Sequence, residues 1–279
     1  MKIQIEPLTT QIGAEISGID LAGPLNDELV AEIGEALLTH KVVFFRDQIL
    51  DDRHLRDIAS RFGPLEAYPL APGADPTIPE VHQLSFDDGS LARGSRVDSW
   101  HTDGTYMECP PMATMLYAVA IPACGGDTCW ADTEAAYDAL SPAVQRLVDG
   151  LTAAHDYAQV RNWLVDDAED PVAAHRAMRD MYPVMHHPVV RTHPVTGGRG
   201  LFVNRNYTTR LDGLSERENA VLLPLLFDHV RDPMFQCRFR WTPGAVAFWD
   251  NRCTQHFGVP DYHGKREMHR VVIKGDRPF

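Results

Sequence analysis

Three segments of the chain place apolar residues three and four positions apart, the spacing that puts them on one face of an α-helix. The first begins after a polar N-cap at Asn26 or Asp27, and the other two span residues 52–62 and 215–229. The last of the three also starts with the sequence pattern of a capping box. The pattern therefore predicts three amphipathic helices.

Shorter apolar runs lie between these helices, and their length and β-branched or aromatic content are typical of strands. Helical and strand patterns are mixed along the chain, and the strand patterns are more numerous. We therefore predict an α+β fold with a mainly β core. The expected strands occupy residues 42–45, 112–121, 185–192, 200–204, 235–241, 245–249 and 268–273.

Two long stretches show neither regular pattern. Residues 68–94 are rich in Pro, Gly and Asp, which predicts a loop that covers an active site, and residues 162–181 indicate a mixed, partly helical insertion. At 279 residues the chain has the size of one large domain, and it contains no internal repeat. We therefore expect a single domain over residues 1–279.

Composition and charge argue against several classes of protein. The net charge of -13 opposes nucleic-acid binding, which depends on many Lys and Arg contacts to phosphates. No segment approaches the roughly 18 unbroken apolar residues of a membrane span, and the first residues lack a signal peptide's apolar run. The five cysteines form an odd set without zinc-like spacing, so disulfides are not expected. We expect a cytoplasmic protein that binds neither nucleic acid nor membrane.

The strongest chemical signal is the motif His101-Thr102-Asp103, because residues two apart on an extended strand point to the same side. A distant His256 supplies a third ligand, and together the three residues match a 2-His-1-carboxylate triad that binds Fe(II) and leaves coordination positions open. Taken alone, a His and an Asp at this spacing also occur in ordinary surface turns. A zinc hydrolase that uses a metal-bound water is a further alternative.

Two arginines follow His256, one just before the last predicted strand and one on it. Arg266 and Arg270 are four residues apart, so both guanidinium groups lie on the same face of that strand. A planar guanidinium can bind a carboxylate or a sulfonate with two parallel hydrogen bonds, whereas the ammonium group of lysine lacks this planar fork. The pair therefore indicates an anion site, whereas the simpler interpretation is a solvated basic strand or an ion pair with nearby Glu267.

At this point the chain resembles the family of taurine dioxygenase and 2,4-dichlorophenoxyacetate dioxygenase, which are Fe(II)/2-oxoglutarate-dependent oxygenases. The resemblance extends over nearly the whole chain, and seven motifs match in the correct order. These are residues 12–18, 42–48, 100–103, 125–128, 189–194, 249–252 and 268–270.

The resemblance implies a fold, a reaction and a set of site residues. The fold would be a double-stranded β-helix, a cupin-like jelly roll flanked by helices. His101, Asp103 and His256 would bind Fe(II), and Arg266 and Thr128 would hold the distal carboxylate of the cosubstrate 2-oxoglutarate. With O2 as the second cosubstrate, such enzymes hydroxylate a small anion and release succinate and CO2. Relatives commonly form homodimers or homotetramers.

The resemblance is weaker at the residues that select the substrate. Arg270 would face the anionic group of the substrate, and Tyr207 is a candidate for the pocket wall, although core packing is the simpler interpretation. Tyr68 and Val97 stand where taurine enzymes carry polar His and Asn residues, so we expect a larger or more apolar anion than taurine.

Several substrates and one noncatalytic function remain open at the level of sequence. The leading hypothesis is a taurine-like enzyme that hydroxylates an organosulfonate, either taurine itself or a larger alkylsulfonate, and releases sulfite. The alternatives are an alkylsulfate dioxygenase, an aryloxyalkanoate dioxygenase and a noncatalytic barrel that binds a metal or ligand.

Overall fold

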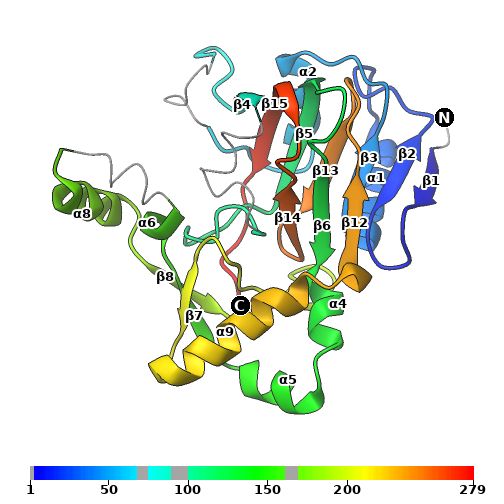
Figure 1. The fold of residues 1–279 in the computed structure, drawn as a ribbon. Helices are drawn as coiled ribbons and strands as arrows, with labels where there is room; N and C mark the ends of the chain where they lie inside the picture. The colour runs from blue at the N-terminus through cyan, green and yellow to red at the C-terminus, as the bar shows by residue number, and fades with distance from the viewer. Residues whose placement is uncertain (1–2, 68–74, 89–99, 161–168) are drawn as a thin grey trace.

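A computed structural model describes residues 3–67, 75–88, 100–160 and 169–279 (Figure 1). Its largest element is a sheet of seven described strands, in which neighbours run antiparallel except for the parallel pair β2 and β3. In spatial order its strands are β1 (Gln4–Pro7), β2 (Ala14–Ser17), β3 (Val42–Phe45), β13 (Val246–Asp250), β5 (Ala113–Ala120), β15 (His263–Ile273) and β4 (Val81–Asp88).

A smaller sheet faces the large one. Its order is β12 (Gln236–Phe239), β6 (Thr128–Asp132) and β14 (Thr254–Gly258), and a bridge between His101 and His256 extends it beyond β14. Large buried side chains from both sheets meet between them, so this interior is the core of a double-stranded β-helix. They include Phe44, Trp130, Phe239, Trp241, Trp249 and Met268.

Helices α1 (Asp27–His40) and α2 (Asp52–Ser60) cover the outer face of the large sheet (Figure 1). Ile33 of α1 and Leu55 of α2 are buried in one cluster with Phe248 of the sheet. Asn26 caps α1 and accepts the backbone N–H of Leu29. Both helices therefore begin and pack as their amphipathic patterns predict.

The other side of the smaller sheet packs against α4 (Thr133–Asp138), α5 (Pro142–Val148) and α9 (Glu216–Val230). Ser215 and Glu218 form the predicted capping box at the start of α9. Short strands complete this region, namely the sheet β11 (Thr208–Leu211), β7 (Thr152–His155) and β8 (Met185–Pro188), and the pair β9 (Val190–Thr192) and β10 (Arg199–Leu201). A 3-10 turn, η1 (Pro233–Phe235), leads into β12.

Two helices extend away from the body of the molecule. Figure 1 shows α6 (Tyr157–Val160) and α8 (Pro171–Met181) as an arm at the left, and α8 contains no buried residue. The arm falls partly within the expected insertion at 162–181, of which 162–168 lie outside the described residues. Asp156 beside α6 pairs with Arg179 of α8 at 2.7 Å, which ties the arm together.

The expected loop at residues 68–94 contains a strand that the pattern did not predict. Residues 81–88 form β4, which pairs with β15 at the edge of the large sheet. The composition of the flanking residues concealed this short strand, because Pro, Gly and Asp on both sides suggested a continuous loop. The rest of that stretch, apart from residues 75–80, lies outside the described residues.

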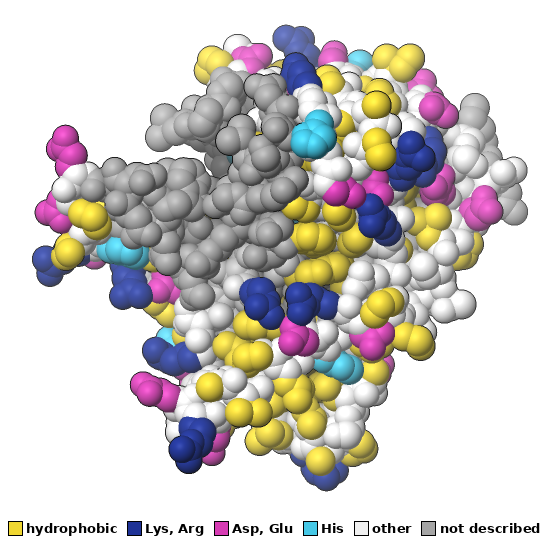
Figure 2. All heavy atoms as spheres, in the orientation of Figure 1, with side chains coloured by type: hydrophobic (Ala, Val, Ile, Leu, Met, Phe, Trp, Pro, Cys, Tyr) yellow, Lys and Arg dark blue, Asp and Glu magenta, His cyan; other side chains and the backbone are white. Residues whose placement is uncertain are grey.

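The fold class is confirmed as α+β, with a mainly β jelly-roll core flanked by helices. On the face shown in Figure 2, basic side chains lie among acidic and apolar ones rather than forming a continuous basic surface in the described part. In the part of the chain that the structure describes, none of the helices has the length and apolar character needed to cross a membrane.

Candidate metal centre

His101 and His256 are direct neighbours across two antiparallel segments, although 155 positions separate them in sequence (256 minus 101). The N–H of His101 donates to the carbonyl of His256 at 3.0 Å, and the N–H of His256 donates back at 2.8 Å. Residues opposed in this way project their side chains to the same face of a sheet. Their imidazole centroids are consequently 4.2 Å apart.

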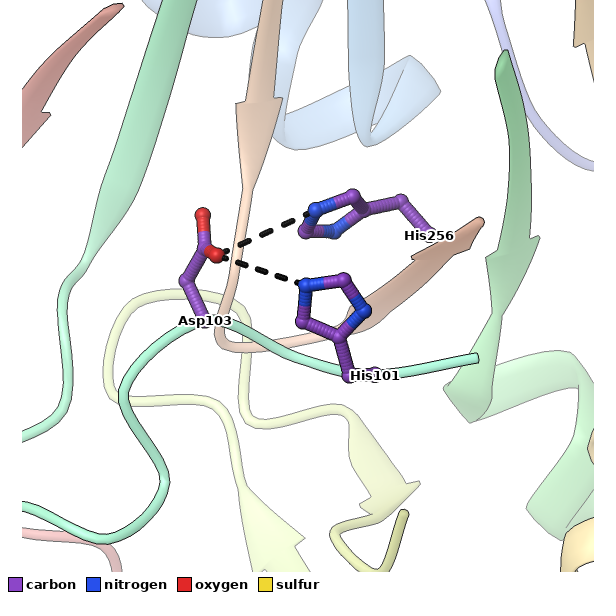
Figure 3. Close-up of side chains that lie close together, drawn as sticks. All are labelled: His101, Asp103 and His256. Atoms are coloured by element: carbon purple, nitrogen blue, oxygen red, sulfur yellow. Dashed lines mark ion pairs between the residues drawn. The ribbon is translucent and has the colours of Figure 1, made fainter. Parts of the chain in front are cut away.

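The carboxylate of Asp103 faces both imidazoles (Figure 3). Its Oδ1 lies 3.7 Å from Nε2 of His101 and 3.8 Å from Nε2 of His256. Both distances exceed those of hydrogen bonds, so the Asp103 oxygen is close to both imidazoles without being hydrogen-bonded to either Nε2 atom. Three ligand atoms within 4.8 Å of one another, with nitrogen and oxygen donors on one side, fit a single metal ion.

The protonation states suit metal binding. Burial, together with the nearby His101, lowers the pKa of His256 to about 3, so its imidazole is neutral at physiological pH. Burial alone would raise the pKa of Asp103. The charges that face it, those of His256 and His101 when protonated and that of Arg270, together with the Thr114 hydroxyl, outweigh burial and leave that pKa below its ordinary value. A neutral imidazole and an ionised carboxylate are the forms in which these side chains bind a metal.

A second group of buried potential ligands consists of His193, Asp250 and Cys253. Here Nδ1 of His193 accepts two backbone N–H groups of the following turn, so its Nε2 carries the proton and donates to Asp250 at 3.1 Å. Arg252 binds both oxygens of Asp250. Burial raises the pKa of the Cys253 thiol, which disfavours a thiolate ligand. This group is a hydrogen-bonded structural cluster.

Arg266 lies on β15 and points, like Met268 two residues later, towards the interior between the sheets. Its Nε donates to the carbonyl of Gly126 at 3.2 Å, and no carboxylate among the described residues pairs with the guanidinium. Burial lowers the pKa of Arg266. A charged, partly buried guanidinium without a counterion is a suitable binding group for an anionic ligand.

Thr128 begins β6 and is buried. Its Oγ1 accepts a hydrogen bond from Nε1 of Trp241 at 3.0 Å. An indole N–H can only donate, so the Thr128 hydroxyl proton is available to a second acceptor. Thr128 lies two residues after Gly126, whose carbonyl accepts the hydrogen bond from Arg266. The Thr128 hydroxyl and the Arg266 contact are therefore on the same short segment.

Arg270 lies close to the three candidate ligands. One terminal nitrogen is 3.8 Å from Oδ1 of Asp103, and the other is 3.2 Å from Nδ1 of His82 on β4. Glu267, the acidic residue that sequence offered as a partner for the arginines, instead pairs with Lys265 and His269. Arg270 therefore combines positive charge with direct proximity to the centre.

Tyr207 lies beside His101, with ring centroids 6.4 Å apart. Its ring is 5.1 Å from that of Tyr106, which in turn packs against Tyr157 at 4.3 Å and Tyr182 at 5.4 Å. We call these four residues the tyrosine cluster. It joins the loop after Asp103 to both helices of the arm. Of these four residues the sequence indicated only Tyr207. Tyr106 was missed, and its one local signal is its position three residues after Asp103.

The structure thus brings together seven of the nine site residues that the sequence indicated. The trio of candidate ligands, the arginine pair and Thr128 surround the interior between the sheets, and Tyr207 borders it. The remaining two, Tyr68 and Val97, lie outside the described residues.

Comparison with known proteins agrees with this arrangement. Residues 4–272 match the family described as taurine catabolism dioxygenase TauD, TfdA family. The chain is 38% identical over 287 residues to an alpha-ketoglutarate-dependent sulfate ester dioxygenase from Pseudomonas putida, covering 100% of this chain and 91% of the relative. It is 37% identical to an alkylsulfatase from Acinetobacter baylyi, covering 99% of this chain and 86% of the relative.

A solved structure gives the same fold. The crystal structure of AAD-2 in complex with Mn(II) and N-oxalylglycine has a TM-score of 0.84 and 27% identity, covering 100% of this chain and 99% of that one. The family match and the two relatives above 30% identity extend over almost the entire sequence. The chain therefore belongs to the TauD, TfdA family and is an alpha-ketoglutarate (2-oxoglutarate)-dependent dioxygenase, which uses Fe(II), 2-oxoglutarate and O2.

Proposed function

We propose that His101, Asp103 and His256 hold the Fe(II) of this dioxygenase. The observation that carries the proposal is the approach of both imidazole Nε2 atoms to one oxygen of Asp103, at 3.7 and 3.8 Å. Two nitrogen donors and one carboxylate are the ligand set of non-haem iron oxygenases and leave coordination positions for other ligands. When bound there, iron supplies the activation of O2 that is coupled to decarboxylation of 2-oxoglutarate.

Arg266 and Thr128 are the proposed binding groups for the distal carboxylate of 2-oxoglutarate. The guanidinium lacks a carboxylate partner among the described residues, and the hydroxyl has a proton to donate. Both hydrogen bonds would go to a charged acceptor, which makes them stronger than bonds between neutral groups. Their task is to fix one end of the cosubstrate and so to orient its other end towards the metal.

Arg270 is the proposed partner of the substrate's anionic head group. Its guanidinium is 3.8 Å from Asp103, so an anion bound to it would hold the adjoining carbon near the metal centre. Tyr207 and the rest of the tyrosine cluster border the same centre and would contact the organic part of the substrate. Tyr68 and Val97 remain proposed substrate contacts.

The substrate that fits best is a sulfate ester with an apolar alkyl or aryl group. Sequence alone favoured an organosulfonate, but two of the relatives, at 38% and 37% identity, are a sulfate ester dioxygenase and an alkylsulfatase. The four aromatic rings of the tyrosine cluster offer a large contact surface to an alkyl or aryl group of such an ester. The organosulfonate stays as the second candidate, which would release sulfite.

The proposed reaction breaks the carbon–oxygen bond of the ester. Hydroxylation of the carbon next to the ester oxygen gives an adduct that carries a hydroxyl and a sulfate group on the same carbon. That adduct collapses to an aldehyde, and the sulfate leaves with the electron pair of the broken bond while the hydroxyl proton is released. Succinate and CO2 are the products of the cosubstrate.

The test is a coupled assay with purified protein, Fe(II), ascorbate, 2-oxoglutarate and a panel of anions. The panel contains alkyl sulfates of increasing length, an aryl-substituted alkyl sulfate, taurine, a longer alkylsulfonate and an aryloxyacetate. We expect the highest kcat/KM with an alkyl sulfate, and one sulfate released per succinate. Sulfite release from a sulfonate at higher kcat/KM would reject the sulfate ester, and no substrate-dependent succinate with any anion would reject the function.

We also propose that residues 1–279 form one domain and that the protein works in the cytoplasm as a homodimer or homotetramer, without nucleic-acid or membrane partners. A reducing compartment suits the five cysteines, which are all free thiols in the structure, and also preserves ferrous iron. Light scattering coupled to size-exclusion chromatography measures the oligomeric state, and a monomer would reject that part of the proposal.

A further inference from the structure

We infer that Thr114 is a positioning residue that leaves only one oxygen of Asp103 available to the metal. Thr114 is fully buried on β5, in the middle of the large sheet, and its hydroxyl donates to Oδ2 of Asp103 at 2.9 Å. The other oxygen, Oδ1, is the one that faces both imidazoles. The two oxygens of this carboxylate therefore have separate partners.

The direction of the Thr114 hydrogen bond is fixed by a chain of buried donors. Nε1 of Trp249 donates to Oδ1 of Asn251 at 2.9 Å, and Nδ2 of Asn251 donates to Oγ1 of Thr114 at 2.9 Å. An indole N–H is only a donor, so the orientation of the Asn251 amide is determined. The Thr114 oxygen then accepts from Asn251, and its proton must go to Asp103. All four side chains are at least nine-tenths buried, which excludes competition from bulk water.

The same chain also links the two protein segments that supply ligands. The Trp249 ring packs against the imidazole of His256, with centroids 4.9 Å apart, while its N–H begins the chain that ends at Asp103. One residue of the large sheet thus supports a ligand on β14 and, through Asn251 and Thr114, a ligand on the loop after His101. Partners of this kind orient the groups that bind a metal.

The consequence concerns the number of coordination positions that the protein occupies. A carboxylate can bind a metal through one oxygen or through both. With Oδ2 bound to the Thr114 hydroxyl, Asp103 offers Oδ1 alone, and a position stays open for the chelating cosubstrate. Without that donor, Asp103 is free to turn its second oxygen towards the metal. This inference rests on the proposed metal ligands and adds a function for a residue outside that set.

The experiment compares Thr114→Val, which keeps the shape and removes the hydroxyl, with Thr114→Ser, which keeps the hydroxyl. Thr254→Val is the matched control, because Thr254 is equally buried but its hydroxyl donates to the backbone carbonyl of Asp250. Each protein is titrated with Mn(II), which is followed by its electron paramagnetic resonance signal. The Mn(II)-loaded proteins are then titrated with N-oxalylglycine, a 2-oxoglutarate analogue, which requires no turnover.

We expect Thr114→Val to weaken N-oxalylglycine binding at saturating Mn(II) by about tenfold or more, on the scale of the roughly 10- to 100-fold losses in metal affinity or activity that follow removal of a metal ligand's partner. Thr114→Ser should stay within about threefold of the parent protein, and Thr254→Val should match the parent even where both Val variants lose thermal stability. Parent-like N-oxalylglycine affinity in Thr114→Val would overturn the inference. A loss of affinity in Thr114→Ser or Thr254→Val as large as the loss in Thr114→Val would also overturn it.

An Asp103→Ala variant separates this failure from failure of the proposed ligand set. If Asp103→Ala binds Mn(II) as tightly as the parent, Asp103 is not a ligand and the proposed metal site is wrong. If Asp103→Ala loses Mn(II) while Thr114→Val keeps full N-oxalylglycine affinity, the ligand set stands and only the role of Thr114 is rejected.

Discussion

Replacing Arg266 by Met should raise the KM for 2-oxoglutarate by about 30- to 140-fold and leave kcat nearly unchanged. Truncating one partner of a buried, hydrogen-bonded charge pair costs about 2 to 5 kcal/mol. Arg266 is only partly buried, so the lower part of that range applies, about 2 to 3 kcal/mol. Each 1.4 kcal/mol changes an affinity about tenfold, which gives the predicted factor.

The position of Arg266 on β15 explains why KM rather than kcat should respond. Four residues of strand span about 13 Å, and Arg270, four residues further along, is the arginine that lies beside the candidate ligand Asp103. In the proposed site Arg266 would therefore contact the end of the cosubstrate that is remote from the reacting atoms. Loss of such a contact weakens the ground state and the transition state equally.

The folded state gives a second, independent readout. Because the Arg266 guanidinium is partly desolvated and has no carboxylate partner among the described residues, its removal should leave the thermal stability of the ligand-free protein unchanged or raise it. Steady-state kinetics at saturating substrate give KM and kcat, and calorimetry gives the Tm. Arg266→Lys keeps the charge but not the planar fork, so its KM should lie between those of the parent and Arg266→Met. A normal KM in Arg266→Met, or a large fall in kcat with KM unchanged, would refute this reasoning.

Three further outcomes are expected. Asp103→Ala should abolish hydroxylation and weaken Mn(II) binding, and normal succinate formation in that variant would show that Asp103 is not a ligand. Arg270→Ala should raise the KM for the sulfate ester at least tenfold while the KM for 2-oxoglutarate stays within about threefold; the opposite pattern would mean that the two arginines have exchanged roles. The third outcome concerns the pH dependence of stability. Burial raises the pKa of Asp250, but the Arg252 guanidinium and His193 have the larger effect and lower this pKa to about 2. A carboxyl whose pKa is lowered in the folded state stabilises the protein at pH values above its unfolded pKa of about 3.9. This contribution, between about 2 and 3 kcal/mol, should disappear as the pH falls from about 4 to 2. Urea unfolding at pH 6 and pH 3 should therefore show a smaller loss of stability in Asp250→Asn than in the parent, and equal losses would count against this account.

Local patterns predicted the features that depend on neighbouring residues. The cap at Asn26 and the capping box at Ser215 are each determined within one helical turn, and both form as expected. The shared face of Arg266 and Arg270 follows from strand alternation alone. The approach of His101 to His256 could not be derived from spacing and was expected only from the ligand motif and the family resemblance.

Features that depend on strand pairing were not accessible from local patterns. Thr114 lies in an apolar run and gives no local sign of a role, because its contact with Asp103 and its contact with Asn251, 137 positions away, exist only in the folded sheet. Tyr182 joins the tyrosine cluster by way of α8, whose position on the body cannot be read from its sequence. In both cases the missing information is a long-range contact, whose partner is chosen by the tertiary fold.

The arrangement makes the candidate metal centre sensitive to how the two sheets pack. Both imidazoles belong to the smaller sheet through the pairing of His101 with His256, whereas the second oxygen of Asp103 is held by Thr114 in the large sheet. The side chains between the sheets, Trp249 above all, therefore set the distance between ligands as well as filling the core. A substitution there that shifts one sheet by even a fraction of an ångström would move the imidazoles relative to the carboxylate. Core packing and metal affinity should consequently change together in this protein, because the same buried contacts determine both.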